Sequence, residues 1–234
     1  MALTDTQIER YSRQIVLPEV GGRGQVRLLQ TVVAFVGDGE VAELALYYLA
    51  AAGIGRIDWY AGTRIQAAQT LRAELADLNP DAAIHLHPGP AMRVAGSRPE
   101  ESHTVVAASS RRQCLEDANA AALRARVPLI VGMHSATGGR LGMFTGYDAA
   151  YPCLSCALHD AHEVLAPQSV LAAPTAAVIG SLLALEVLAL RLGLETTPAG
   201  VWLQYDADAL TITRQTTSKR PDCVVCAAAA GACT

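Results

Sequence analysis

The chain has 234 residues, enough to bury one sizeable hydrophobic core, and 51% of them are hydrophobic while only 17% are charged. Its formal net charge of −4 argues against a nucleic-acid-binding protein, because non-specific binding to nucleic acid requires a basic surface. Residues 1–14 are polar and charged rather than apolar. We therefore expect no secretory signal, a cytoplasmic location, and cysteines that serve as thiols or metal ligands.

Apolar, β-prone runs alternate with helical patterns along the first half of the chain. The expected strands are Val32–Val36, Arg56–Tyr60, Ala83–His87, Thr104–Ala107 and Pro128–Gly132. The expected helices are Val41–Ala52, Gln66–Leu78 and Arg111–Arg126. This alternation predicts an α/β fold with a Rossmann-like, mostly parallel sheet that is covered by helices on both faces.

The second half has a different pattern. Gly138–Tyr147 and Val201–Thr213 predict an antiparallel extension of the sheet, because Gly and Asp-Ala-Asp turns interrupt their β-prone residues. Thr175–Leu192 predicts a helix that is apolar on nearly every face, which the sheet or another subunit must cover. The most apolar stretch, residues 170–190, contains a proline, a glycine and a glutamate, which favours a buried helix over a membrane span.

The turn after the first strand has the shape of a nucleotide-binding loop. Gly37 and Gly39 permit the tight turn, and the following helix would offer its backbone N–H groups to a phosphate. Asp38 and Glu40, however, stand at this helix N-terminus. A carboxylate about 4 Å from a phosphate costs roughly 4 kcal/mol per charge pair at a surface-like dielectric. The same acids stabilise a helix start without any ligand, and this second interpretation is the better one.

Four cysteines form two CxxC pairs that lie far apart in the sequence. They are Cys153 with Cys156, and Cys223 with Cys226. Four thiolates in two such pairs are typical of a tetrahedral structural zinc site, which would hold the C-terminal segment against the middle of the chain. The alternatives are unrelated surface cysteines or a single redox-active pair. His159 and His162 follow the first pair and could substitute as ligands, or they are ordinary residues.

Several motifs, in this order, resemble the ThiF/MoeB/HesA family, which is related to ubiquitin-activating enzymes. They are Arg10–Gly21 with Gly24-Gln25, Leu49–Gly55, Leu78–Asp81, Pro152–Cys156, Ala177–Glu186 and Pro221–Cys226. The resemblance implies a dimer that uses ATP and magnesium to adenylate the C-terminal Gly-Gly of a small ubiquitin-like or sulfur-carrier protein. It also implies one domain, residues 1–234, with an N-terminal helical arm (1–30), a Rossmann-like core (31–135) and a zinc-bearing, dimerising part (136–234).

The positions that carry the family's chemistry depart from its pattern. The family loop reads GxGGxG, and an acid after the second strand binds the ribose, but residues 59–63 contain no acid. Asp58 is expected to point to the opposite face from Trp59, because side chains alternate along a strand. The basic segment that binds phosphate in the family is missing between Gly62 and Gln66.

The remaining family positions are also altered. Arg64 or Arg72 could replace a phosphate-binding cation, although a solvated arginine is the simpler interpretation. Ser110 stands where the family has its catalytic aspartate, and a hydroxyl is a poor ligand for magnesium. Residues 162–173 contain none of the cysteines that some relatives use. We therefore expect a divergent member with a degenerate ATP site, in which binding of ATP and magnesium is doubtful.

Two arginines of the opening motif are kept. In the family this motif includes an arginine that reaches the ATP site of the neighbouring subunit, so Arg10 or Arg13 could act in trans; alternatively, the motif only packs the N-terminal helix. The first hypothesis is a binding or regulatory subunit for a sulfur-carrier or ubiquitin-like protein or for an active paralogue, as a homodimer or heterodimer. The second is an active adenylyltransferase with a rebuilt site. A Rossmann oxidoreductase or methyltransferase is a third, disfavoured by the cysteine pairs and the opening motif.

Overall fold

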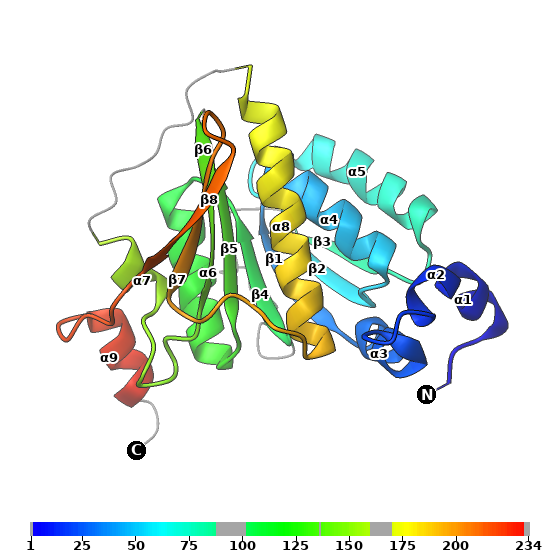
Figure 1. The fold of residues 1–234 in the computed structure, drawn as a ribbon, viewed down its shortest axis with the longest axis horizontal. Coiled ribbons are helices and arrows are strands. Elements are labelled where there is room, and N and C mark those ends of the chain that lie inside the picture. Colours follow the sequence, from blue (N-terminus) through cyan, green and yellow to red (C-terminus); the bar gives the residue numbers. More distant parts are fainter. Residues whose placement is uncertain (1, 88–101, 136, 160–169, 232–234) are drawn as a thin grey trace.

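The computed structural model describes residues 2–87, 102–135, 137–159 and 170–231, which form one sheet with helices on both faces (Figure 1). Its strands are β1 Val32–Gly37, β2 Arg56–Tyr60, β3 Ala83–His87, β4 Thr104–Ala108, β5 Leu129–His134, β6 Gly138–Phe144, β7 Val201–Asp206 and β8 Thr211–Thr216. The sheet order is β3-β2-β1-β4-β5-β6-β7-β8. The strands from β3 to β5 are parallel, and β6, β7 and β8 extend them in antiparallel fashion, which confirms the predicted fold class.

The helices lie mostly where the apolar periodicity predicts them. They are α1 Asp5–Arg10, α2 Ser12–Ile15, α3 Gly21–Leu29, α4 Glu40–Ala52, α5 Ile65–Leu78, α6 Arg112–Ala125, α7 Leu154–Ala157, α8 Ala172–Leu192 and α9 Val224–Gly231. Helices α4 and α8 pack against each other and α8 packs on β5 and β6, whereas α6 packs on β4 and β5. Sequence periodicity did not predict α1, α2, α7 and α9 as separate helices, because each is short.

The central strand shows why the sheet is buried on both sides. Val33 and Phe35 belong to the core under α4 and α8, whereas Ala34 and Val36 belong to the core under α6. Successive side chains of a strand point to opposite faces, so a strand covered on both faces must be apolar throughout. The continuous apolar run of β1 therefore follows from its central place in the sheet.

Helix α8 is covered on one side only. Ile179 and Leu183 are buried, whereas Leu185 is 59% exposed and faces away from the sheet. Among the described residues α8 is the one helix long and apolar enough to cross a membrane, and half of its apolar window is buried inside the protein. Core helices of soluble proteins commonly have this length and composition, so this observation alone is weak evidence for a membrane span.

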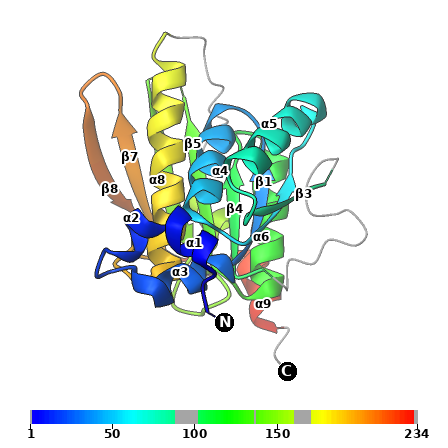
Figure 2. The ribbon, with the colours of Figure 1, turned by 90° about the vertical axis from the view of Figure 1, so that its right-hand side faces the viewer.

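The last two strands form a hairpin at one end of the sheet. Figure 2 shows this β7–β8 hairpin at the side of the molecule, beyond α8, with β8 outermost. The sequence predicted antiparallel strands or a hairpin with an Asp-Ala-Asp turn in Val201–Thr213. The structure has this hairpin, with residues 207–210 as the turn and the second strand continuing to Thr216. The hairpin wall and the start of α6 border the pocket described below.

Candidate functional site

The turn between β1 and α4 has the backbone of a nucleotide-binding loop. Gly37 has a φ of 139° and Gly39 a φ of 90°, which are conformations that favour glycine. A β-carbon at Gly37 would also collide with the carbonyl oxygen of Ala108 at the end of β4. The indole N–H of Trp59 donates to the carbonyl oxygen of Gly37 at 2.8 Å, so a side chain of the neighbouring strand β2 holds the turn in place. The strand, turn and helix are therefore all in place.

An internal ion pair lies at this loop. The Asp38 carboxylate accepts from Arg111 Nη2 at 2.9 Å and from the backbone N–H of Thr63 at 3.3 Å. Arg111 Nη1 also donates to the Thr63 hydroxyl at 3.3 Å. The Asp38 side chain is only 15% exposed. Asp38 thus accepts the hydrogen bonds from a cation and a backbone amide that a phosphate oxygen would otherwise accept.

The segment after β2 closes against this pair. Gly62 has a φ of 64°, and a β-carbon there would press on the Arg111 guanidinium and approach the Asp38 carboxylate to 2.9 Å. Only a residue without a side chain leaves room for the pair. Sequence reasoning did not identify Arg111 as the partner of Asp38. The pairing could have been found from the parallel order of β1 and β4, because the carboxyl ends of the two strands meet at one edge of the sheet.

The other charged residues of this region have positions that need no ligand to explain them. Glu40 is exposed in the first turn of α4, where an acid favours the helix dipole. Arg64 lies 3.8 Å from Glu43 with both side chains largely exposed, and Arg72 is exposed on α5. Asp58 pairs with Arg56 at 2.7 Å, on the face opposite to the core that contains Trp59, as the strand alternation predicted.

Ser110 lines a pocket of about 370 Å³ at the carboxyl end of β5. The apolar side chains of Leu115 and Met133 contribute to its lining, together with His134 and polar groups of the β6–β8 wall. Burial lowers the pKa of His134 although Glu40 opposes this shift, so the imidazole is neutral near pH 7. Two arginines, Arg112 and Arg140, and one acid, Asp206, also line the pocket.

The two CxxC pairs converge on one point. The pairs Cys153–Cys156, Cys153–Cys223 and Cys156–Cys226 have Sγ–Sγ distances of 3.9, 3.9 and 3.5 Å. Four thiolates about 2.3 Å from one tetrahedral zinc ion would lie about 3.8 Å apart, so the sulfur positions fit such an ion. All four side chains are buried, and among the described residues they form the one cluster that could hold a metal.

This geometry favours a shared metal site over the other two interpretations of the cysteines. Unrelated surface cysteines would not be buried together, and a single redox pair would not need the second pair beside it. Burial raises the pKa of Cys153 and Cys226, whereas hydrogen bonds from nearby backbone and thiol groups outweigh burial and lower the pKa of Cys223 to about 7. His159 is exposed and lies outside the cluster, and His162 falls outside the described residues.

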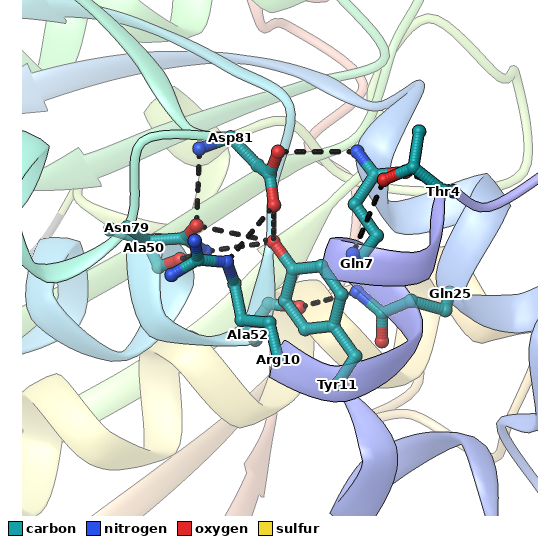
Figure 3. A network of polar contacts seen from close by, with 9 residues as sticks. All are labelled: Thr4, Gln7, Arg10, Tyr11, Gln25, Ala50, Ala52, Asn79 and Asp81. Atoms are coloured by element: carbon teal, nitrogen blue, oxygen red, sulfur yellow. Dashed lines mark hydrogen bonds and ion pairs between the residues drawn. The ribbon is translucent and has the colours of Figure 1, made fainter.

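The N-terminal arm is held by a buried tyrosine. Figure 3 shows the Tyr11 hydroxyl between Asn79 and Asp81, with Asp81 Oδ2 at 3.1 Å. Arg10 Nε lies 3.2 Å from the same Asp81 oxygen, so this guanidinium pairs within its own chain. Arg13 is exposed and pairs with no acid among the residues that the structure describes. Of the two arginines of the opening motif, Arg13 is therefore the one available to a neighbour.

Comparisons with known proteins agree with this architecture. The family whose model matches is the ThiF family, over residues 62–225. The chain is 29% identical to a sulfur carrier protein adenylyltransferase of Thermus thermophilus, covering 97% of this chain and 93% of that protein. It is 32% identical to the adenylyltransferase and sulfurtransferase MOCS3 of Drosophila yakuba, of which it spans 55%. Its fold is similar to that of Escherichia coli MccB, solved with ATP, with a TM-score of 0.71 and 16% identity over 95% of this chain and 75% of that one.

Proposed function

The chain belongs to the ThiF family, and we propose that it is a binding or regulatory member that has lost ATP-dependent adenylation. Its partner would be a sulfur-carrier or ubiquitin-like protein, or an active paralogue. The names of its relatives support the partner, because they describe adenylyltransferases, one of them acting on a sulfur carrier protein. The pair of Asp38 and Arg111 supports the loss of the reaction.

The ion pair is the single observation that carries the proposal. Arg111 is a cation at the N-terminus of α4 that could meet a nucleotide phosphate, but it already pairs with Asp38 at 2.9 Å. Arg64, whose guanidinium lies beside Gly39, is the other cation there, and it pairs with Glu43 at 3.8 Å. Displacing Asp38 would leave a carboxylate beside the phosphate, at a cost of roughly 4 kcal/mol per charge pair about 4 Å apart. The exposed Glu40 carboxylate adds to this repulsion.

The residues present do not fit magnesium and ATP. Magnesium takes oxygen ligands in a strict octahedral geometry and favours carboxylates, but the position at the end of β4 carries Ser110. The nearby carboxylate of Asp38 is engaged with Arg111 and Thr63. No acid follows β2 to bind a ribose. In this proposal the chain carries out no adenylation step.

The cysteine cluster fits a structural zinc ion. Cys153 directly precedes α7 and Cys156 lies within it, while Cys223 directly precedes α9 and Cys226 lies in its first turn. Zinc bound there would hold these two segments together and neutralise thiolates that are costly to bury. Four protein ligands leave no open coordination position, so this metal would supply stability rather than catalysis.

The pocket beside Ser110 supports peptide binding. Its volume of about 370 Å³ falls within the usual range for ligand sites of roughly 300–1,000 Å³. Leu115 and Met133 offer apolar contact, and the guanidinium group of Arg140 suits a carboxylate, whereas Arg112 already pairs with Glu116 at 2.9 Å. The terminal segment of a carrier protein would place an extended chain against these apolar side chains and its terminal carboxylate beside a guanidinium group.

The exposed side of α8 supports a dimer. Tyr48, Leu185 and Leu194 border a groove of about 350 Å³ with an almost entirely apolar lining. Exposed contiguous apolar surface of this kind marks protein contacts. Arg13, exposed on the N-terminal arm, would then be free to contact the partner, as a homodimer or as a heterodimer with an active paralogue.

An active adenylyltransferase with a rebuilt site is the second candidate. The observation in its favour is the polar lining of the pocket next to Ser110, which includes His134 and two arginines. The experiment that separates the two is a pyrophosphate-release assay with ATP, magnesium and purified sulfur-carrier proteins ending in Gly-Gly. Our proposal predicts binding of a carrier without release of pyrophosphate, and release that depends on the carrier would overturn it.

A further inference from the structure

We propose that Asn119 of α6 is a positioning residue for the metal site, because its side-chain amide fixes the turn that presents Cys153 and Cys156. This inference rests on the zinc ion of the proposed function and adds a residue that is not itself a ligand. Hydrogen bonds from outside the ligand set commonly orient metal ligands, and their loss lowers metal affinity about 10- to 100-fold.

The side chain of Asn119 is buried between α6 and α7. Only 2% of this residue is exposed. Its Oδ1 accepts a hydrogen bond from the backbone N–H of Leu154 at 3.1 Å, and its Nδ2 donates to the hydroxyl of Ser155 at 3.1 Å. Leu154 and Ser155 are the two residues between Cys153 and Cys156. One buried amide therefore holds both residues that separate the two thiols.

The hydrogen bond to Leu154 takes the place of a helix cap. The first N–H groups of a helix have no partner within the helix and need one from elsewhere. Such a partner is commonly the side chain of the N-cap residue. In α7 the N-cap residue is Cys153, whose side chain makes no capping hydrogen bond. The cap of this short helix therefore comes from α6.

The same face of α6 also contacts the cysteines directly. Leu123 follows Asn119 by four residues, so the two side chains lie on one face of the helix. Leu123 is buried in one apolar cluster with the four cysteines. Helix α6 packs on β4 and β5, so its position does not depend on the metal. It thus provides a fixed support for the first half of the site.

The second pair of cysteines has no such support. Val224 and Val225 separate Cys223 from Cys226, and in the part of the chain that the structure describes no side chain bonds to the backbone of either valine. Val224 is also 79% exposed. We therefore expect the first half of the site to keep its shape without metal, and the second half to be ordered by the metal.

Competitive zinc titration of the full chain against a fluorescent chelator, under reducing conditions, tests the proposal. Asn119→Leu removes both hydrogen bonds with little change in volume and should weaken zinc binding by about tenfold or more. Asn119→Asp keeps an oxygen that can accept from the Leu154 N–H. It should bind zinc within about threefold of the unmodified chain, although a buried carboxylate lowers its stability.

Tyr11→Phe is the matched control for a general loss of stability. It removes a buried hydrogen-bonding group on the N-terminal arm, and its zinc affinity should equal that of the unmodified chain. Zinc affinity that follows thermal stability across these three variants would show that Asn119 acts through packing alone and would overturn the proposal. Unchanged affinity of Asn119→Leu would overturn it as well.

Amide hydrogen exchange of the unmodified chain gives a second readout that does not depend on a variant. The Leu154 amide is bonded to Asn119, whereas the Ala227 amide is bonded to the carbonyl oxygen of Cys223 at 3.0 Å. When a chelator removes zinc, exchange at Ala227 should become at least about tenfold faster, and exchange at Leu154 should change by less than about threefold. Equal acceleration at both amides would overturn the proposal.

The zinc content of the unmodified chain separates this inference from the rest of the proposed function. If the unmodified chain binds no zinc, the metal site is wrong and the role of Asn119 is wrong with it. Binding of a carrier protein is measured independently and does not decide the role of Asn119. Zinc binding that is insensitive to Asn119→Leu would overturn this inference and leave the metal site intact.

Discussion

The glycine loop and the cysteine cluster differ in what their side chains are arranged to bind. In the loop, the backbone turn at Gly37 and Gly39 is kept, but the side chains around it now pair with each other. In the cluster, both the turns and the four thiols that they present are kept. A turn that packs against its neighbours is maintained for stability, so the side chains beside it decide whether the chemistry is also maintained. Function in this fold must therefore be judged from the side chains.

The largest expected effect is a loss of stability when one cysteine of the four-cysteine cluster is replaced. Cys153→Ser should remove one of the four metal ligands and destabilise the protein by more than about 3 kcal/mol, because α7 and α9 lose their link. Thermal unfolding together with a zinc assay measures this. The matched control is Cys114→Ser, a buried thiol of α6 outside the cluster, which should keep the bound zinc. Equal stability of the Cys153 variant and the unmodified protein would refute a structural metal.

The next largest expected effect is on the binding of pyrophosphate at the Gly37–Gly39 loop. Asp38→Asn should release Arg111 and remove one carboxylate from the phosphate position, so that pyrophosphate binds at least about tenfold more tightly. Calorimetric titration with pyrophosphate measures the change. Glu40→Gln removes an exposed acid of the same loop that forms no ion pair with any residue that the structure describes, and it should give a smaller gain. If both variants bind no better than the unmodified chain, the ion pair does not control the site.

The N-terminal network gives a moderate effect. Tyr11→Phe should destabilise the protein by about 1–2 kcal/mol, because Asn79 and Asp81 lose a buried hydrogen-bonding partner. Burial raises the pKa of Tyr11 from 10.0 to about 12. The stability from the neutral hydroxyl is therefore complete below pH 10 and is lost as the pH rises through 12. Urea unfolding at several alkaline pH values should show this loss in the unmodified protein and not in the variant.

The smallest effect separates the two arginines of the opening motif. Arg10→Ala should cost up to about 1 kcal/mol, since Arg10 pairs with the half-buried Asp81. Arg13→Ala should change stability by less than about 0.5 kcal/mol, because its side chain is exposed. Any effect of Arg13→Ala should instead appear in the association of subunits, measured by light scattering. A larger loss of stability for Arg13 than for Arg10 would contradict these assignments.

Much of the fold could be predicted because its signals are local. Apolar runs such as Val32–Val36 gave the parallel core, and helical spacing gave α4, α5 and α6 within a few residues. The convergence of the four cysteines was also predictable, since the CxxC spacing limits each pair to one ion. The division into an arm, a core and a dimerising part remains a prediction.

The pair of Asp38 and Arg111 could not be predicted in the same way. These residues are separated by 73 positions and meet only because β1 and β4 are neighbours in the sheet. The sequence indicated that the acid was unsuited to phosphate, but its partner depends on strand order. The pairing of Arg10 with Asp81 is similar, because it needs the arm to pack beside the turn after α5.

Titration of the unmodified chain with ATP and magnesium, followed by calorimetry, tests the central claim most directly. The ion pair of Asp38 and Arg111, the missing ribose acid and Ser110 together predict no binding tighter than about 1 mM. A dissociation constant in the micromolar range would contradict the account, because it would require the phosphates to bind at the loop in spite of its acids.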